Sequence, residues 1–283
     1  MTLSGALWVM GDPHGEAGRL GALLTRAELL GAEGNWEGAD AALCCLGDLV
    51  DRGPDGLGVI ELLMRLEGQA GAAGGRVCVL LGNHEVLLLA ARQFGHAWRD
   101  ARGRSLLERW RLSRGQERDL ENLTPQQANW LADRPALARI GPYLFAHADS
   151  GAYLQYGRTV GEVNAAVREV LQGKDPTQWD ALTRALSERG AYAGEDGPAR
   201  AAELLAAYGG EKLIHGHTPI SYLLKVPPER VRGPLLYAGG KVVNVDGGLA
   251  YDPRAGFLAR LGEGGVERVL TVAREGSVGR HAR

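Results

Sequence analysis

The chain has 283 residues, of which 45% are hydrophobic and 23% are charged, and its formal net charge at pH 7 is −2. This length allows one large domain with a buried core, or two smaller domains. A net charge so close to zero gives no indication of a general nucleic-acid or membrane-surface binder. No apolar run approaches the roughly 18 residues that a membrane span needs.

The cysteines are Cys44, Cys45 and Cys78, and all three lie in strand-like runs. An odd number of cysteines in buried strands does not make a disulfide framework and fits a reducing compartment. No basic stretch precedes the first apolar run, which therefore indicates a strand rather than a secretory signal. We expect a cytoplasmic protein.

The first third of the chain predicts three buried strands, over residues 6–10, 41–46 and 76–81. Helices are expected after them, over about 16–30, from about Pro54 and from about His84, with loops at 31–38 and 68–75. This repeated order of strand, loop and helix is typical of parallel strands in an α/β layer.

The segment 95–138 is rich in Arg, Glu and Gln and contains Trp98, Trp110 and Trp130 in a helical-looking pattern. We interpret it as a helical cover or insertion beside the strand ends. Its tryptophans either pack a small core or form a surface on which a nucleoside could stack.

The remainder predicts a strand at 143–146, helices over about 160–207 with a break at 190–197, and a short apolar pair at 213–214. The tail has short alternating runs, which suggest an antiparallel or mixed second sheet. These runs are 235–238, 242–245, 257–261 and 266–272. We expect residues 1–283 to form a single domain that includes the cover segment.

Three short blocks directly follow the first three predicted strands. They are Gly11-Asp12-Pro13-His14-Gly15, Gly47-Asp48-Leu49-Val50-Asp51-Arg52-Gly53 and Gly82-Asn83-His84-Glu85. Successive blocks lie about one βαβ unit apart, which brings neighbouring strand ends side by side. Their carboxylates, amide and imidazoles are ligands that divalent metals accept, so the sequence predicts a two-metal hydrolytic site.

Six residues are expected to hold the two ions: Asp12, His14, Asp48, Asn83, His147 and His217. Asp12 and His14 alternate on one short loop and can turn toward one ion, while Asp48 can bridge both ions through its two oxygens. Asn83 offers a neutral amide oxygen to the second ion, which the two later histidines complete. His215 alternates to the other face of its strand and is not expected to be a ligand.

The three blocks resemble the signature motifs of the calcineurin-like metallophosphoesterases. Two later segments, Phe145-Ala146-His147-Ala148 and Gly216-His217-Thr218-Pro219, resemble the remaining histidine motifs of the phosphoprotein phosphatase branch. That branch includes bacteriophage lambda phosphatase and bacterial diadenosine tetraphosphate hydrolases. The resemblance spans residues 6 to about 219. It implies an α/β fold, a β-sandwich of two mixed sheets flanked by helices, and two divalent ions, manganese foremost, with iron or zinc as alternatives.

The resemblance also implies catalytic roles that the chemistry of the residues supports. A hydroxide bridging the two ions would attack the phosphorus in line, and His84 would protonate the leaving oxygen while Asp51 orients its ring. Arg52 would bind the phosphoryl oxygens in bidentate fashion. For the second phosphate-binding arginine usual in the family we nominate Arg189, with Arg184 as the alternative.

The expected activity is hydrolysis of phosphomonoesters, of the phosphoserine and phosphothreonine protein phosphatase type. The alternative is a symmetrical bis(5'-nucleosyl)-tetraphosphatase, and a remote one is a non-catalytic metal-binding interaction module. No Cys has an Arg six positions on, and no P-loop motif occurs, so two other phosphatase classes lack support. Asp149, which stands where family members often have Gly, is either a partner of the site or a specificity residue.

Overall fold

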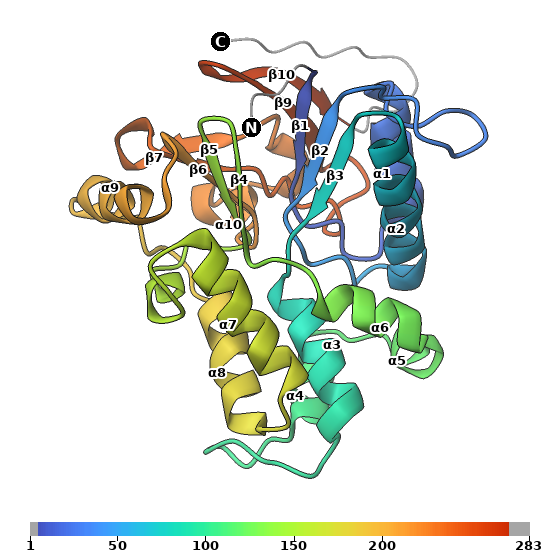
Figure 1. Ribbon diagram of the computed structural model, residues 1–283, viewed down its shortest axis with the longest axis vertical. Helices are drawn as coiled ribbons and strands as arrows, with labels where there is room; N and C mark the ends of the chain where they lie inside the picture. The colour runs from blue at the N-terminus through green and yellow to red at the C-terminus, as the bar shows by residue number, and fades with distance from the viewer. Residues whose placement is uncertain (1–4, 272–283) are drawn as a thin grey trace.

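Two five-stranded sheets lie above a layer of helices in the computed structural model, which describes residues 5–271 (Figure 1). The first sheet has the order β10-β9-β1-β2-β3, and the second has the order β4-β5-β6-β8-β7. The first sheet contains β1 (Leu7–Met10), β2 (Ala42–Cys45), β3 (Arg76–Val79), β9 (Phe257–Gly262) and β10 (Gly265–Thr271). The second contains β4 (Leu137–Ile140), β5 (Tyr143–Ala146), β6 (Lys212–His215), β7 (Leu235–Tyr237) and β8 (Val242–Asn244).

Each sheet has parallel strands at its centre and antiparallel strands at one or both edges. β1, β2 and β3 are parallel to one another, and so are β5, β6 and β8. β9 and β10 join the first sheet in antiparallel fashion, and β4 and β7 do the same in the second. The predicted α/β architecture with two mixed sheets is therefore confirmed.

The strands β1, β2 and β5 are continuously apolar because both of their faces are buried. Along β1, Leu7 and Val9 belong to the core between the two sheets, whereas Trp8 and Met10 belong to the core under the helices. Successive side chains of a strand point to opposite faces, so a strand covered on both sides needs apolar residues at every position. This packing fixes the strand ends from which the predicted blocks emerge.

The helices cover the outer faces and the carboxyl ends of the strands (Figure 1). α1 (Ala17–Arg26) and α2 (Gly56–Ala72) flank the first sheet, and α9 (Gly197–Tyr208) packs beside β6 of the second. The lower layer contains α3 (Asn83–Phe94), α4 (Leu106–Leu112), α5 (Glu117–Asn122), α6 (Pro125–Ala132), α7 (Val160–Gln172) and α8 (Pro176–Leu186). The short elements are α10 (Ile220–Leu224), η1 (Ala152–Gln155), η2 (Pro228–Arg230) and η3 (Ala238–Gly240).

Several sequence-based boundaries were wrong. α1 ends at Arg26 rather than near residue 30, and α2 runs through Gly68 and Gly71 to Ala72 because its buried face packs on β3. The helix expected from Pro54 begins at Gly56, since the Asp55 side chain accepts from the Gly58 N–H and caps it.

The tail and the cover segment also differ from expectation. Only β7 and β8 of the tail join the second sheet, whereas β9 and β10 extend the first. Residue 272, in the last predicted run, lies outside the described residues. Within the cover segment, helices occur only between residues 106 and 132. The segment then ends in β4, which begins at Leu137 and pairs with β5 across the turn at Gly141.

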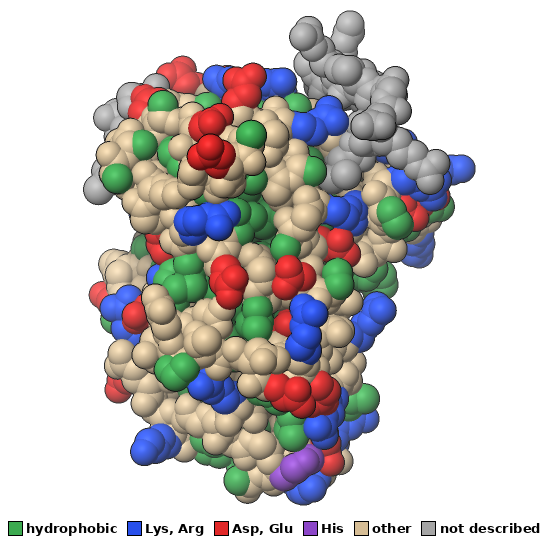
Figure 2. Space-filling view, turned by 90° about the vertical axis from the view of Figure 1, so that its right-hand side faces the viewer, with side chains coloured by type: hydrophobic (Ala, Val, Ile, Leu, Met, Phe, Trp, Pro, Cys, Tyr) green, Lys and Arg blue, Asp and Glu red, His purple; other side chains and the backbone are tan. Residues whose placement is uncertain are grey.

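Figure 2 shows one side of the molecule, on which acidic and basic side chains are interspersed, in keeping with the small net charge of the sequence. Within residues 5–271, none of the helices combines the length and the apolar character that crossing a bilayer requires.

Candidate functional site

The predicted metal ligands come together where the strands of both sheets end. Asp12 and His14 follow β1, Asp48 follows β2, and Asn83 begins the helix after β3. His147 follows β5 and His217 follows β6, so these two residues reach the same place from the second sheet. All six side chains are buried, with at most 6% of any of them exposed.

Two overlapping groups of side chains could each hold a metal ion. One contains Asp12, Asp48, His147 and His217, and the other contains His14, Asp48 and His84. In each group the ligand atoms lie within 4.8 Å of one another. Asp48 belongs to both, which is the arrangement that a bridging carboxylate requires. The assignment of Asp12 and His14 to one ion stays a prediction, since the two groups separate them.

The histidines present their free nitrogens to this space. His14 Nδ1 lies 2.8 Å from the Val50 carbonyl, and His147 Nδ1 lies 2.8 Å from the Leu46 carbonyl. Because a carbonyl only accepts, each Nδ1 donates and each Nε2 keeps its lone pair for a metal. His147 Nε2 lies 3.0 Å from Asn83 Oδ1 and 3.4 Å from Asp48 Oδ1.

The electrostatics of the group fit divalent cations. The Nε2 atoms of His14 and His217 are buried without a hydrogen-bond partner. Burial lowers the pKa of both imidazoles well below the usual value, which keeps them neutral and able to bind a metal. Burial also raises the pKa of Asp12 well above its usual value, and the Asp246 and Asp48 carboxylates raise it further. A cation among these groups would relieve that repulsion.

A second set of contacts surrounds His84. Its Nδ1 lies 2.6 Å from Asp51 Oδ2, and its Nε2 lies 3.2 Å from Nη2 of Arg52. Trp110 of α4 donates from its indole N–H to the other Asp51 oxygen, at 2.9 Å. The Arg52 N–H donates to the carbonyl of Arg114 at 3.0 Å. The cover segment thus holds Asp51 and Arg52 in place.

The backbone of the site is strained at five predicted residues. His14, Asp48, Asp51, Arg52 and His217 all have φ between +39° and +66°. The left-handed conformation costs a non-glycine residue roughly 1–2 kcal/mol, and such residues cluster at functional sites. The preceding Gly47 (φ +95°) could not carry a side chain, because a Cβ there would lie 2.5 Å from the Gly82 nitrogen.

The two arginines nominated for the second phosphate contact differ in their surroundings. Arg184 forms an ion pair with Asp180 at 2.8 Å on the surface of α8. Burial lowers the pKa of His147 and of His217, and the positive charge of Arg189 lowers the pKa of both further. Of the two arginines, Arg189 is thus the one whose charge acts on histidines of the metal-capable group.

Two of the remaining expectations concern residues that do not point into the site. His215 is in neither metal-capable group, as expected, and its Nε2 lies 2.7 Å from the Tyr237 hydroxyl. The cover tryptophans pack against the core: Trp110 is fully buried, Trp130 donates to Glu67, and Trp98 is partly buried. Trp110 therefore offers no surface for stacking, whereas Trp98 and Trp130 stay partly exposed.

Sequence reasoning missed Glu85, Trp110 and Asp246. Glu85 accepts from the backbone N–H groups of Gly82, Asp48 and Leu49, each at 2.8 Å, and so ties two of the blocks together. Its position three residues after a helix N-cap is a recognisable signal. The partnership of Trp110 with Asp51, and of Asp246 with Asp12, joins distant segments and has no local signal.

Replacing Glu85 by Ala is expected to lower the free energy of unfolding by about 3–5 kcal/mol, because three buried N–H groups lose their acceptor. Urea denaturation of the purified variant measures this loss. The matched control is Glu169→Ala on the exposed face of α7, expected to change stability by less than about 0.5 kcal/mol. A loss below about 1 kcal/mol for Glu85→Ala would contradict the cross-linking role.

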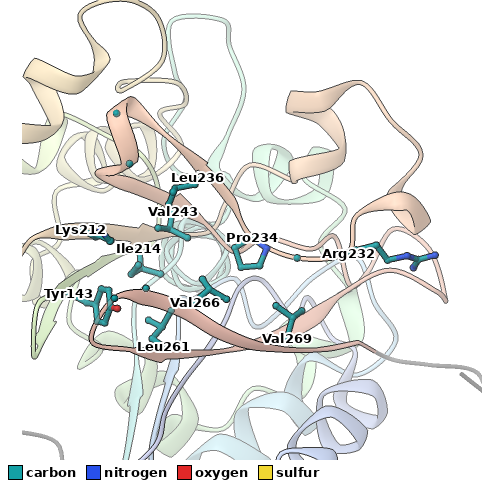
Figure 3. Close-up of a pocket in the computed structure, with 15 residues that line it drawn as sticks. Tyr143, Lys212, Ile214, Arg232, Pro234, Leu236, Val243, Leu261, Val266 and Val269 are labelled. Carbon is teal, nitrogen blue, oxygen red and sulfur yellow. The ribbon is translucent and has the colours of Figure 1, made fainter. Parts of the chain in front are cut away.

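A separate cavity of about 550 Å³ lies between the segment around β7 and β8 and the β9–β10 hairpin. Tyr143 and Lys212 line one end of it and Arg232 the other, with apolar side chains between them (Figure 3). None of its lining residues belongs to the predicted site. The cavity is therefore distinct from the metal-capable groups.

Comparison with known proteins identifies the class to which this fold and site belong. The family model described as calcineurin-like phosphoesterase matches residues 6–221. The chain therefore belongs to the calcineurin-like phosphoesterase family.

Among individual relatives, a symmetrical bis(5'-nucleosyl)-tetraphosphatase of Bordetella parapertussis is 29% identical over 188 residues, which cover 62% of this chain and 59% of the relative. The chain thus spans about three fifths of the length of that relative. The Shewanella-like protein phosphatase 1 of Plasmodium berghei is 35% identical over 86 residues, 30% of this chain and 24% of its own length.

The solved structures confirm the fold. The cold-active protein tyrosine phosphatase of a psychrophilic Shewanella species superposes with a TM-score of 0.71, covering 94% of this chain and 77% of that protein at 21% sequence identity. At this identity the similarity concerns the arrangement of sheets and helices alone.

Proposed function

We propose that the protein is a dimetal phosphomonoesterase of the phosphoprotein phosphatase type. One observation carries this proposal: Asp48 is shared by two metal-capable groups, and the pair of His84 and Asp51 lies directly beside it together with Arg52. Metal ligands, a proton donor and a phosphate-binding cation thereby meet at one set of strand ends. These are the three elements that hydrolysis of a phosphomonoester needs.

The proposed metal ligands are Asp12, His14, Asp48, Asn83, His147 and His217, and manganese is the proposed metal, with iron or zinc as alternatives. A bound pair of divalent ions would supply charge neutralisation and a lowered pKa for water at this site. The protein holds its imidazoles neutral and their ring orientations fixed through the Val50 and Leu46 carbonyls. The ligands are therefore preorganised in the folded chain.

His84 is the proposed proton donor to the leaving oxygen. Burial lowers the pKa of its ring, but the Asp48 and Asp51 carboxylates outweigh burial and raise the pKa above the usual value. A raised pKa favours the protonated ring, the form that a general acid requires. Arg52, half-buried beside it, is the proposed ligand for the phosphoryl oxygens, with Arg189 as the second.

Replacing Asp51 by Asn is expected to shift the alkaline limb of the pH–rate profile to lower pH. Removal of the anion lowers the pKa of His84, so the acid form is lost at a lower pH. The profile of kcat/KM against pH measures this shift. Trp110→Phe removes a hydrogen bond but leaves the Asp51 charge, so the limb should move much less. Equal profiles for Asp51→Asn and wild type would contradict the role of this pair.

The two arginine candidates are distinguished by single substitutions. Arg189→Ala is expected to raise KM for a phosphomonoester about tenfold, since a charge-assisted phosphate contact is worth roughly 1.5–3 kcal/mol. Arg184→Ala should change KM less than about twofold, because an exposed ion pair contributes little. Steady-state kinetics on both variants decide between the two arginines. A larger rise in KM for Arg184→Ala than for Arg189→Ala would make Arg184 the second phosphate ligand.

The second candidate function is symmetrical hydrolysis of dinucleoside tetraphosphates. The similarity to the Bordetella parapertussis relative favours it. The full burial of Trp110 weighs against it, because this residue offers no surface on which a nucleoside could stack. A non-catalytic module is disfavoured by the presence of Asp48, Asp51 and His84 in mutual contact.

A substrate panel on manganese-reconstituted protein tests the proposal. Phosphoserine, phosphothreonine and phosphotyrosine peptides are compared with diadenosine tetraphosphate at equal concentration, and phosphate or ADP release is measured. The proposal predicts cleavage of a phosphopeptide and little release of ADP. Fast conversion of the dinucleotide to ADP with untouched phosphopeptides would replace it by the second candidate.

We also propose that the whole chain forms one domain that includes the cover segment. The contacts of the cover residues Trp110 and Arg114 with the second block support this. The three buried cysteines without disulfides support a reducing, cytoplasmic location.

A further inference from the structure

The loop that carries Arg189 is held by the carboxylate of Asp149. Both carboxylate oxygens accept from the Gly190 N–H, each at 3.0 Å, and the Ala191 N–H donates to the Asp149 carbonyl at 3.2 Å. Gly190 has φ +75°, a turn conformation that favours glycine. Gly190, the residue after Arg189, is therefore fixed to Asp149, which lies two residues beyond His147 in the segment that follows β5.

The residue before Arg189 is fixed to the same segment. The Glu188 carboxylate accepts from the Ser150 hydroxyl at 2.5 Å and from the Gly151 N–H at 3.0 Å. The hydroxyl of Tyr192, further along the loop, donates to the Ser150 carbonyl at 2.8 Å. Both chain neighbours of Arg189 are thus anchored, while its own side chain remains exposed.

Asp149 is itself fixed by the second sheet. It is 4% exposed, and it accepts from the Tyr237 hydroxyl of β7 at 2.9 Å. The same hydroxyl lies 2.7 Å from Nε2 of His215, the last residue of β6. A buried carboxylate with several donors is held in a single orientation, which is what a support for a flexible arginine requires.

We propose that Asp149 is a positioning residue: it holds Gly190, and through it directs the Arg189 guanidinium toward the substrate phosphate. The proposal rests on the proposed function, since Arg189 is there the second phosphate ligand. It gives a role to Asp149, for which the sequence left two roles open. It also accounts for the contact of Tyr237 with the buried His215 beside a site in which neither serves as a ligand.

A double-mutant cycle on metal-reconstituted protein tests the coupling. Asp149→Ala is expected to raise KM, and the inhibition constant of inorganic phosphate, roughly tenfold, with kcat changed far less. In the Arg189→Ala background the same substitution should add almost nothing, because Asp149 then has no arginine to position. Asp149→Asn, which keeps one acceptor oxygen, should recover much of the loss. Arg168→Ala, an exposed ion-pair variant on α7, serves as the control.

Tryptic cleavage after Arg189 provides a readout that is independent of turnover. Inorganic phosphate should protect the Arg189–Gly190 bond of the metal-loaded protein, and Asp149→Ala should accelerate cleavage and abolish that protection. Mass spectrometry identifies the cleavage site. Tyr237→Phe, which removes one bond to Asp149, should give a smaller change in the same direction and covers the case in which Asp149→Ala fails to fold.

Two results would overturn the proposal: an equal rise in KM from Asp149→Ala with and without Arg189, or phosphate protection unchanged by the substitution. Failure of the proposed function is a different result, in which wild-type protein cleaves no phosphomonoester. In that case the proteolysis measurement still tests whether Asp149 positions Arg189.

Discussion

Replacing Asp48 by Asn is expected to reduce kcat/KM for a phosphomonoester by at least about a thousandfold. Asp48 is the one residue that both metal-capable groups share. Its Oδ1 also accepts from the His84 N–H at 3.0 Å, and its Oδ2 lies 3.5 Å from His14 Nε2. An amide of the same shape keeps one oxygen but loses the negative charge, so both ions would be held weakly.

Metal content distinguishes this loss from simple unfolding. The variant should bind less metal by elemental analysis while its far-UV circular dichroism stays that of wild type. Asp133→Asn, at an exposed surface ion pair, is the matched control and should keep full activity and metal. Retention of wild-type turnover by Asp48→Asn would rule out a shared bridging carboxylate.

Replacing His84 by Asn is expected to lower kcat about 10²–10⁴-fold, the usual contribution of general acid catalysis. The loss should depend on the leaving group. An alkoxide such as that of serine needs the proton, whereas p-nitrophenolate leaves without it. The expected ratio of wild-type to variant kcat is therefore large for a phosphoserine peptide and small for p-nitrophenyl phosphate.

His96→Asn is the control for this substitution, because the side-chain hydrogen bond that His96 makes in the described part of the chain is to Ser105. His96→Asn should leave kcat for both substrates unchanged. An equal loss on both substrates for His84→Asn would contradict proton donation and would instead indicate a role in metal binding, which the proximity of His84 to His14 and Asp48 also permits.

The three parallel strands of the first sheet could be predicted from sequence because the signals are local. Apolar runs buried on both faces, each ending at a polar block, predicted β1, β2 and β3 and their parallel arrangement. The partners of β9 and β10 could not be predicted. The alternation of apolar and polar residues in these strands is the same whichever sheet they join. In the structure β9 pairs with β1, with Leu261 opposite Leu7.

The site could be predicted for the residues that lie within blocks. The structure brings Asp12, His14, Asp48, Asn83 and the two later histidines together in the space that the blocks imply. The residues that support this site could not be predicted. Trp110 meets Asp51 only because α4 folds over the second block, and Asp149 meets Gly190 across 41 residues of chain. Such contacts are made by tertiary packing, and the spacing of residues along the chain does not indicate them.

The central claim, a catalytic centre with two metal ions, is tested most directly by titrating metal-free protein with manganese while bound metal and phosphomonoesterase activity are measured together. The account predicts that activity appears with binding, saturates at two ions per chain, and is lost again on chelation. Full activity in the metal-free protein, or saturation at a single ion, would contradict it.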